Sequence, residues 1–272
     1  MIDSANAPWM QYGLIAGVAL LASALTFVSG FGLGTLLLPA FALFLPIEAA
    51  IASTAVVHLA NGLLKAALMG RFADTKVLLR FGLPAAAFAA LGAILQTLLT
   101  RGNDLATWTL WGHTHTVTPV GLTIGLVMIV FAAIELHPRF DRLEFGPRWL
   151  PVGGVVSGFF GGLSGHQGAL RSAFLARSGL SKESFIGTGV LIAVIIDVVR
   201  LAFYLPDRAA ALSTSHAAGA PASGLIAVGC AAAFIGTLIG QRALKKLTLR
   251  SVQMVVGVGL LIFGALLAGG VL

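Results

Sequence analysis

The chain has 272 residues, of which 58% are hydrophobic and only 10% are charged, and its mean hydropathy is +0.97. Soluble domains carry about 25% charged residues, so this composition excludes a water-soluble globular protein and favours a membrane protein. The formal net charge of +7 does not indicate nucleic-acid binding, because Lys and Arg lie in short gaps between apolar runs and form no basic face.

The N-terminal residues 1–11 contain no basic region, so we expect an extracytoplasmic segment and not a cleaved signal peptide. Apolar segments follow at 12–29, 31–45, 47–69, 81–99, 118–137, 150–164, 167–180, 184–205, 223–241 and 251–271. A spanning helix needs about 20 apolar residues, so 31–45 and 167–180 are either short spans or second arms of re-entrant hairpins. Cys230, the one cysteine, lies in an apolar run and is interpreted as a packing residue.

The basic residues predict the orientation of the chain. Suppose that segment 12–45 enters the membrane and returns to the same side, and that segment 150–180 does likewise. Twelve of the 17 Lys and Arg residues then lie on one side of the membrane. Their gaps are 70–80, 138–149, 177–183 and 242–250. The opposite side then holds only Arg101 and Arg208, whereas counting each pair as one crossing divides the charges evenly. Because cytoplasmic loops carry the excess of Lys and Arg, we predict a bacterial inner-membrane protein with both termini extracytoplasmic.

Matches at a spacing of 135 residues indicate an internal repeat, since Ser29-Gly30 recurs as Ser164-Gly165. The same spacing relates Glu48 to Glu183, Ser53 to Thr188 and Lys65 to Arg200, and Gly92 corresponds to Gly236 at a slightly larger spacing. Each half then makes an odd number of crossings, so the halves are inverted, as in many secondary transporters. We predict an all-α polytopic fold of about 8–10 helical segments. Its parts are a first repeat at 12–137, a cytoplasmic linker at 138–149 and a second repeat at 150–272.

Two stretches resemble a known family. SGFGLGTLLLPAFALF at 29–44, followed by AAIASTAVVHLANGLLKAAL at 49–68, is similar to the first half of the sulfite exporter TauE/SafE family, a group of sulfonate permeases that includes 4-toluene sulfonate uptake. SGFFGGLSGHQGALRSAFL at 157–175, followed by FIGTGVLIAVIIDVVR at 185–200, is similar to its second half. The resemblance implies a permease for sulfite, sulfoacetate or another organosulfonate. Arg171 stands where the family pattern has an apolar residue.

The two Gly-rich breaks are candidate parts of a binding site. Unwound backbone is tolerated at depth only where it is buried in protein or lines a cavity, and the N–H groups of the following half-helices, 35–44 and 169–176, favour an anion. Close packing through small residues is the alternative. The candidate substrate-binding residues at the breaks are Ser29, Gly30, Gly32, Gly34, Ser164, Gly165, His166 and Gln167.

Arg171 is a further candidate for substrate binding, because a charge inside a short apolar segment is costly and its guanidinium fork suits a sulfonate. Snorkelling or a structural ion pair is the alternative. His58 and Asn61 lie three residues apart on one predicted helix face and offer a substrate contact, a proton relay or a satisfied core pair. Lys65 and Arg200 are candidates for gating or an access path.

Asp197 lies three residues before Arg200, at the spacing of an ion pair on one helix face, and we place it with Lys65 and Arg200 in the predicted access path. Snorkelling and structural pairing are the alternatives for these residues. Neither a metal-ligand cluster nor a nucleotide motif is present in the sequence, so we expect no metal and no cofactor. The expected partners are a small sulfur-containing anion and the lipid bilayer, with a homodimer left open.

One motif favours an enzyme. Ser164 lies in a GLSG stretch that matches the G-x-S-G of rhomboid intramembrane proteases, and His216 follows in the order that a Ser–His dyad needs. However, His216 lies in a loop-like stretch with Pro206 and Pro221, and Ser29, the repeat counterpart of Ser164, has no dyad. We therefore predict a transporter and no enzyme, with a rhomboid-like protease or a non-transporting structural membrane protein as the alternatives.

Overall fold

The computed structural model describes residues 8–29, 32–110, 112–137, 145–214, 216–217, 220–243 and 249–272. The helices within these ranges are α1 (Pro8–Ser29), α2 (Leu33–Ala42), α3 (Ile47–Met69), α4 (Thr75–Thr100), α5 (Pro119–Leu136), α6 (Leu150–Ser164), α7 (Gly168–Leu175), α8 (Lys182–Thr214), α9 (Ala222–Ala243) and α10 (Leu249–Ala268). Two 3-10 turns, η2 (Gly70–Phe72) and η4 (Pro147–Trp149), precede α4 and α6. The strands are β1 (Ala106–Leu110), β2 (His113–Val117), β3 (His216–Ala217) and β4 (Ala220–Pro221).

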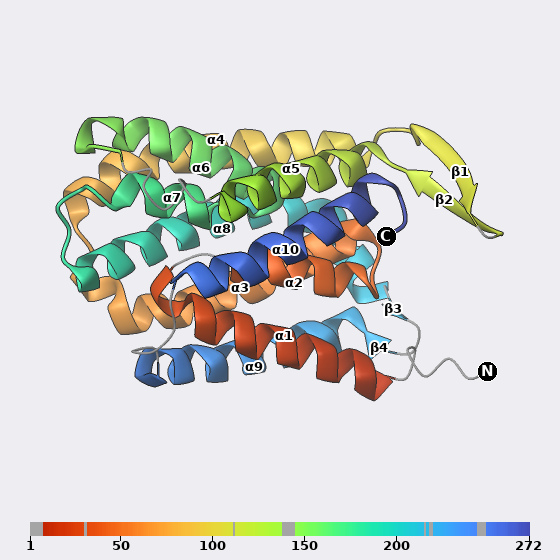
Figure 1. Ribbon diagram of the computed structural model, residues 1–272, viewed down its shortest axis with the longest axis horizontal. Helices are drawn as coiled ribbons and strands as arrows, with labels where there is room; N and C mark the ends of the chain where they lie inside the picture. The colour runs from red at the N-terminus through yellow and green to blue at the C-terminus, as the bar shows by residue number, and fades with distance from the viewer. Residues whose placement is uncertain are drawn as a thin grey trace.

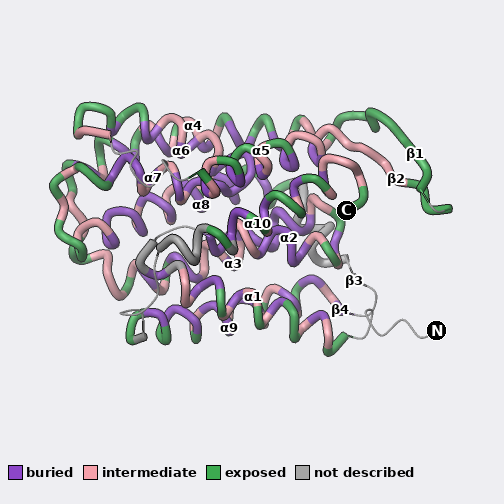
Figure 2. Tube along the Cα trace, viewed as in Figure 1, coloured by how far each residue is buried: buried purple, intermediate pink, exposed green. Residues whose placement is uncertain are grey.

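The helical body has the dimensions and surface of a membrane protein. Six helices in the described part of the chain are long and apolar enough to cross a bilayer, namely α1, α3, α4, α5, α8 and α9. Large apolar side chains such as Leu83, Leu98 and Val130 are exposed on outward faces, while the buried residues line the interior (Figure 2). Soluble monomers rarely expose so much apolar surface, whereas a surface of this kind suits contact with lipid. The predicted all-α polytopic membrane fold is confirmed.

The turns gather at the two ends of the helical body (Figure 1). One end holds the start of α1, the end of α10 and both β-hairpins, and the other holds η2, η4 and the turn from α7 to α8. Arg71 is in η2, Arg148 is in η4 and Arg177 is in the turn after α7, whereas Arg101 directly follows α4 at the first end. The basic residues therefore cluster at one end as expected, and the assignment of that end to the cytoplasm remains a prediction from the positive-inside rule.

The second Gly-rich break forms a re-entrant hairpin. α6 has 15 residues and α7 has 8, so they rise about 22 Å and 12 Å, less than the roughly 30 Å hydrocarbon core. The chain reverses at Gly165, whose φ of 82° is left-handed, and α7 returns to the end from which α6 started (Figure 1). In the first half, a full-length α1 is followed by the ten-residue α2, which begins after Gly32 at φ 109°.

Helix pairing follows a pattern that supports the predicted repeat. α4 packs on α6, α1 on α9, α3 on α8 and α5 on α10. If each of α1–α5 is exchanged with its counterpart in α6–α10, the same four pairs result. For example, the α4–α6 pair becomes the α9–α1 pair. α1 and α6 also begin at opposite ends of the body (Figure 1), as inverted halves require. The boundaries at 12–137 and 150–272 remain a prediction.

Two glycines that correspond in the sequence make corresponding contacts. A Cβ on Gly92 of α4 would overlap the carbonyl oxygen of Phe159 on α6, and a Cβ on Gly236 of α9 would overlap the carbonyl oxygen of Leu20 on α1. Each glycine therefore lets two helix backbones touch, which is how small residues bring membrane helices close together.

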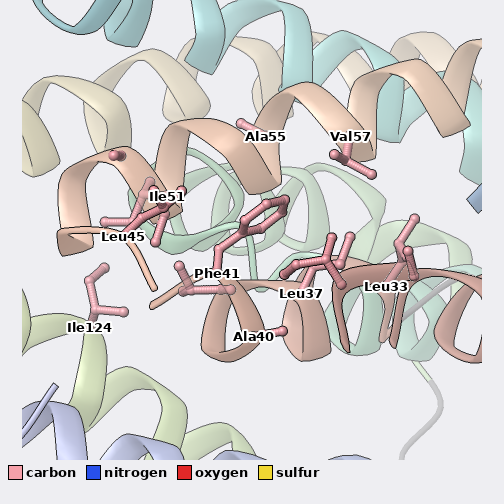
Figure 3. Close-up of a cluster of buried hydrophobic side chains, with 14 of the residues drawn as sticks. Leu33, Leu37, Ala40, Phe41, Leu45, Ile51, Ala55, Val57 and Ile124 are labelled. Atoms are coloured by element: carbon pink, nitrogen blue, oxygen red, sulfur yellow. The ribbon is translucent and has the colours of Figure 1, made fainter. Parts of the chain in front are cut away.

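The short helix α2 lies inside the body. Leu37 and Phe41 are fully buried and pack with Ile51 of α3 and Ile124 of α5 in one apolar cluster (Figure 3). Of the described helix residues Leu33–Ala42, none is charged. Burial of these leucines and of Phe41 holds α2 in place.

The β1–β2 hairpin was not predicted, and it projects beyond the helices (Figure 1). Its strands pair Trp108 with His115 and Leu110 with His113. Trp108 Nε1 donates a hydrogen bond to the Gly269 carbonyl at 2.7 Å, so the hairpin is attached to the end of α10. The alternation of Thr with larger residues at 106–117 is the strand signal.

The predicted end of the segment 184–205 was wrong. The segment expected at 184–205 continues as helix α8 to Thr214, and Pro206 lies inside that helix. The stretch between Pro206 and Pro221 is thus partly helical and partly the β3–β4 hairpin, and not simply a loop. The apolar residues Ala209–Leu212 extend the helical pattern past the proline, which membrane helices tolerate.

Candidate functional site

A cavity of about 40 Å³ lies between α3, α7 and α8, with Phe27 of α1 and Leu33 of α2 also in its wall. Its polar lining residues are His58, Asn61, Lys65, Arg171 and Ser172. A buried water needs about 10–15 Å³, so the cavity has room for a few water-sized groups. Lys65 is near the end of α3 and Phe185 is near the start of α8, so the cavity lies nearer the end with the basic turns.

Two cationic side chains line this cavity. Lys65 of α3 is buried, and its Nζ lies 5.7 Å from the centroid of the Phe27 ring, within the range of a cation–π contact. Arg171 of α7 is also buried, with 3% of its surface exposed. Among the described residues that line the cavity there is no Asp or Glu. The cavity wall therefore favours an anion, and its two cations come from different halves of the chain.

A hydrogen-bond chain behind the wall connects Arg171 to His58. Arg171 Nη1 donates to Gln167 Oε1 at 3.2 Å, and Gln167 Nε2 donates to Asp197 Oδ1 at 3.3 Å. His58 Nδ1 lies 2.5 Å from Asp197 Oδ2. Ser157 Oγ donates to the Gln167 carbonyl at 3.0 Å and so holds the start of α7. Because Arg171 and His58 both line the cavity, the chain begins and ends there.

Asp197 also forms an ion pair with Arg200, with 3.0 Å between Oδ1 and Nη2. Both side chains are almost completely buried, and among the described residues Arg200 Nε has no hydrogen-bond partner. The buried carboxylate of Asp197 needs a cation such as Arg200 beside it, because an unpaired charge in a buried position is costly. The predicted pairing of Asp197 with Arg200 is present, and the pair lies behind the cavity wall.

The two Gly-rich breaks approach each other beside these residues. A Cβ on Gly34 would lie 3.3 Å from His58 Cδ2 and 3.8 Å from the Gly165 carbonyl oxygen. A Cβ on Gly165 would lie 2.5 Å from Arg200 Nη1. The missing side chains therefore make room for the imidazole of His58 and the guanidinium of Arg200. Tyr204 donates a hydrogen bond to the Gly162 carbonyl in the last turn of α6.

Ser164 and His166 lie together at the second break. Ser164 Oγ donates to the Phe160 carbonyl at 3.0 Å, and His166 Nδ1 is 3.0 Å from Ser164 Oγ. Because the single hydroxyl proton goes to Phe160, Nδ1 of His166 is the donor in the second bond, the reverse of a general base. His216, the predicted dyad partner, is in strand β3 at the end with the chain termini, and its side chain lies outside the described residues.

Asn61 links three helices. Its Nδ2 donates to Ser23 Oγ of α1 at 3.0 Å, and its Oδ1 accepts from Thr237 Oγ1 of α9 at 2.7 Å. Ser23 and Thr237 are themselves 2.8 Å apart. A buried polar cluster with its bonds made fixes the relative positions of helices, so Asn61 has a packing role in addition to its place in the cavity wall.

The structure thus brings together His58, Asn61, Lys65 and Arg171 at the cavity, with Gln167, Asp197 and Arg200 behind them. Lys65 forms part of the cavity wall itself. Gly32 caps α2 and is buried, whereas the side chain of Ser29 and all of Gly30 lie outside the described residues. In the described part of the chain, no group of three His, Cys, Asp or Glu residues is placed to hold a metal ion.

Several lining residues were not predicted. Phe27 and Phe185 form apolar wall, and Gly62 and Gly189 lie on the facing helices α3 and α8. A Cβ on Gly189 would lie 3.5 Å from Arg171 Nε, so the glycine leaves space beside the guanidinium. A glycine inside a helical run is a sequence signal for close approach, but it does not say which side chain approaches.

A helical membrane body with a cavity lined by two basic side chains is typical of membrane transport proteins. The sequence model of the sulfite exporter TauE/SafE family matches residues 15–267. The chain therefore belongs to the TauE/SafE family of sulfite exporters, which are membrane transporters, and the resemblance seen in the sequence is confirmed. Comparison with the curated proteins gives no match.

Proposed function

We propose that the protein is a secondary transporter that exports a small sulfur-containing anion, such as sulfite, sulfoacetate or another organosulfonate. The anion binds in the cavity between α3, α7 and α8 and crosses by alternating access. One observation carries the proposal: the buried side chains of Lys65 and Arg171, from different halves of the chain, line the same cavity. Intramembrane cations that face a cavity are typical of a substrate pathway.

The two cations offer different contacts to a sulfur oxyanion. The planar guanidinium of Arg171 presents a fork of donors that matches two oxygens, and the ammonium of Lys65 acts as a point charge. Charge-assisted hydrogen bonds of this kind are about twice as strong as neutral ones. The cavity volume of about 40 Å³ favours sulfite, the smallest of the named ligands, in this conformation.

The direction of transport follows from the membrane potential. A negative charge leaving a negative cytoplasm gains about 2.3 kcal/mol per 100 mV, so export needs no further energy source. The cavity lies nearer the end with the basic turns, which the positive-inside rule assigns to the cytoplasm of a bacterial inner membrane. With this orientation, the proposed site lies closer to the cytoplasm, the side from which an exported anion binds.

The test is anion binding to purified protein with Arg171 altered. Thermal-shift and calorimetric titrations with sulfite, sulfoacetate, thiosulfate, taurine and sulfate identify the ligand, because a bound ligand raises the melting temperature. Hydrogen bonds to charged groups contribute about 1.5–3 kcal/mol, so Arg171→Ala should weaken binding roughly 10- to 150-fold. Arg171→Lys keeps the positive charge but loses the forked guanidinium. Its anion affinity should therefore lie between those of the wild type and Arg171→Ala.

The matched control is Arg80→Ala, which removes an exposed arginine from α4 and should bind the anion as the wild type does. Wild-type affinity in Arg171→Ala would show that the cavity is not the binding site. If none of the anions binds to the folded wild type, the protein is not a transporter of these ligands, and a structural role gains support.

A further inference from the structure

We propose that Gly189 of α8 determines which anions the cavity admits. The space that it leaves beside Arg171 receives the atom or group that distinguishes thiosulfate and the organosulfonates from sulfite. Sulfite has only a lone pair at that position of its sulfur atom, whereas the larger anions carry a further sulfur or carbon there. The inference rests on the proposed anion site, and it adds the residue that sets the size of the anion.

Other glycines of these helices serve close packing. A Cβ on Gly187, two residues earlier in α8, would overlap the carbonyl oxygen of Met69. Gly62 of α3 also lines the cavity, but a Cβ there would lie only 3.1 Å from Val194 Cγ2 on α8. Each of these glycines therefore lets two helices approach, which is the usual role of small residues in membrane helices.

Gly189 is not required for packing. A Cβ on it would meet two side chains of α7, Arg171 Nε at 3.5 Å and Leu175 Cδ1 at 3.8 Å, which are ordinary van der Waals distances. The corresponding position of α3, 135 residues earlier, carries the buried Thr54, so the repeat tolerates a side chain there. Glycine is among the least favourable residues inside a helix. The space that it leaves in the cavity is therefore the reason we assign to it.

This space lies where the anion is proposed to bind. Arg171 Nη1 donates to Gln167 behind the cavity wall, whereas Arg171 Nε lies beside Gly189. An oxyanion that takes two parallel hydrogen bonds from Nε and Nη2 of the guanidinium fork has its sulfur atom near this edge. An atom attached to that sulfur then needs room over Gly189.

The wall around Gly189 is apolar. Leu175 of α7 and Phe185, Ile186 and Val190 of α8 line the same cavity. The outer sulfur of thiosulfate or a short hydrocarbon group suits such a wall. The fourth oxygen of sulfate does not, because a polar oxygen placed there loses hydrogen bonds with water. We therefore expect the wild type to bind thiosulfate more tightly than sulfate.

The experiment is calorimetric titration of the full-length wild type and Gly189→Ala with sulfite, sulfate and thiosulfate. At a mildly alkaline pH all three are dianions, so differences between them report size and chemistry and not charge. The added methyl group should leave sulfite affinity close to that of the wild type. It should weaken thiosulfate binding roughly 10- to 200-fold, the usual effect of one group in a fitted pocket. Sulfoacetate should weaken in the same way.

The fold provides a second readout. The melting temperature of Gly189→Ala should stay the same or rise, because alanine favours a helix more than glycine does and its Cβ has room. The matched control is Gly82→Ala in α4, where the Cβ of a buried glycine would also lie 3.6 Å from its nearest neighbours. Gly82 lies outside the helices that enclose the cavity, so this variant should keep every anion affinity.

The outcomes separate the inference from the proposed function. If Gly189→Ala weakens sulfite and thiosulfate by the same factor, or weakens neither, Gly189 does not select by size and the anion site stands. The inference also fails if the wild type binds sulfite but neither thiosulfate nor sulfoacetate, or if Gly189→Ala melts well below the wild type. Absence of binding by every anion to the folded wild type removes both the anion site and its selectivity.

Discussion

The two short helices after the Gly-rich breaks, α2 and α7, have the same place in the fold and opposite chemistry. α2 is apolar in its described residues and packs Leu37 and Phe41 into the core (Figure 3). α7 carries Arg171 into a cavity and begins beside Gln167, which bonds to Asp197. One break therefore supplies packing and the other supplies the cation.

This difference indicates that a repeated backbone does not require a repeated site. The first half compensates through α3, which contributes His58 and Lys65. The second half contributes Arg171 from α7, and Asp197 and Arg200 from α8. The two halves thus have the same helix pairing but supply their cavity residues from different helices. Three substitutions test which of these positions serve packing and which serve anion binding.

The largest effect is expected from Leu37→Ala in α2. Removing a fully buried leucine side chain leaves a cavity and should lower the free energy of unfolding by about 2–5 kcal/mol. The anion affinity should be unchanged, because Leu37 does not line the site. Thermal unfolding in detergent and anion titration measure the two quantities. Loss of affinity without loss of stability would place α2 in the site after all.

Gly165→Ala should have the next largest effect. A left-handed residue with a Cβ costs about 1–3 kcal/mol, and this Cβ would also lie 2.5 Å from Arg200 Nη1. We expect lower stability together with weaker anion binding, since Arg200 pairs with Asp197. Gly179→Ala is the control, because Gly179 has φ 76° with open space around it. Equal effects of the two substitutions on anion binding would contradict a role for the Gly165 contact.

Ser164→Ala should have the smallest effect. It removes the hydrogen bond to the Phe160 carbonyl and the contact with His166, with a stability cost of about 1 kcal/mol. A serine-directed fluorophosphonate should not label the wild-type protein. Labelling of Ser164 that disappears in His216→Ala would instead support the protease alternative.

The sequence was sufficient for the parts that depend on local composition. Apolar runs of about 20 residues predict the spanning helices, and the pair of Gly-rich breaks predicts where the short helices begin. Arg171 was identifiable because a charge in an apolar segment is costly. The segment at 184–205 was predicted too short, since helix α8 continues past Pro206 to Thr214.

The contacts between distant segments were not predictable. His58 and Asp197 are 139 residues apart, and nothing in either local sequence says that they meet. Lys65 was predicted to lie along an access path. Its position near a helix end gave no sign that it lines the same cavity as Arg171. The Ser23–Asn61–Thr237 cluster similarly joins α1, α3 and α9 through side chains from separate segments.

The glycine contacts of Gly92 and Gly236 have a consequence for how the molecule changes shape. They lock α4 to α6 and α1 to α9 backbone against backbone, and each locked pair joins a helix of the first half to a helix of the second. These pairs are expected to travel as rigid units, because interlocked backbones resist sliding. A change of shape that keeps these contacts therefore moves helices of both halves together, and it does not separate the two halves along their boundary in the sequence.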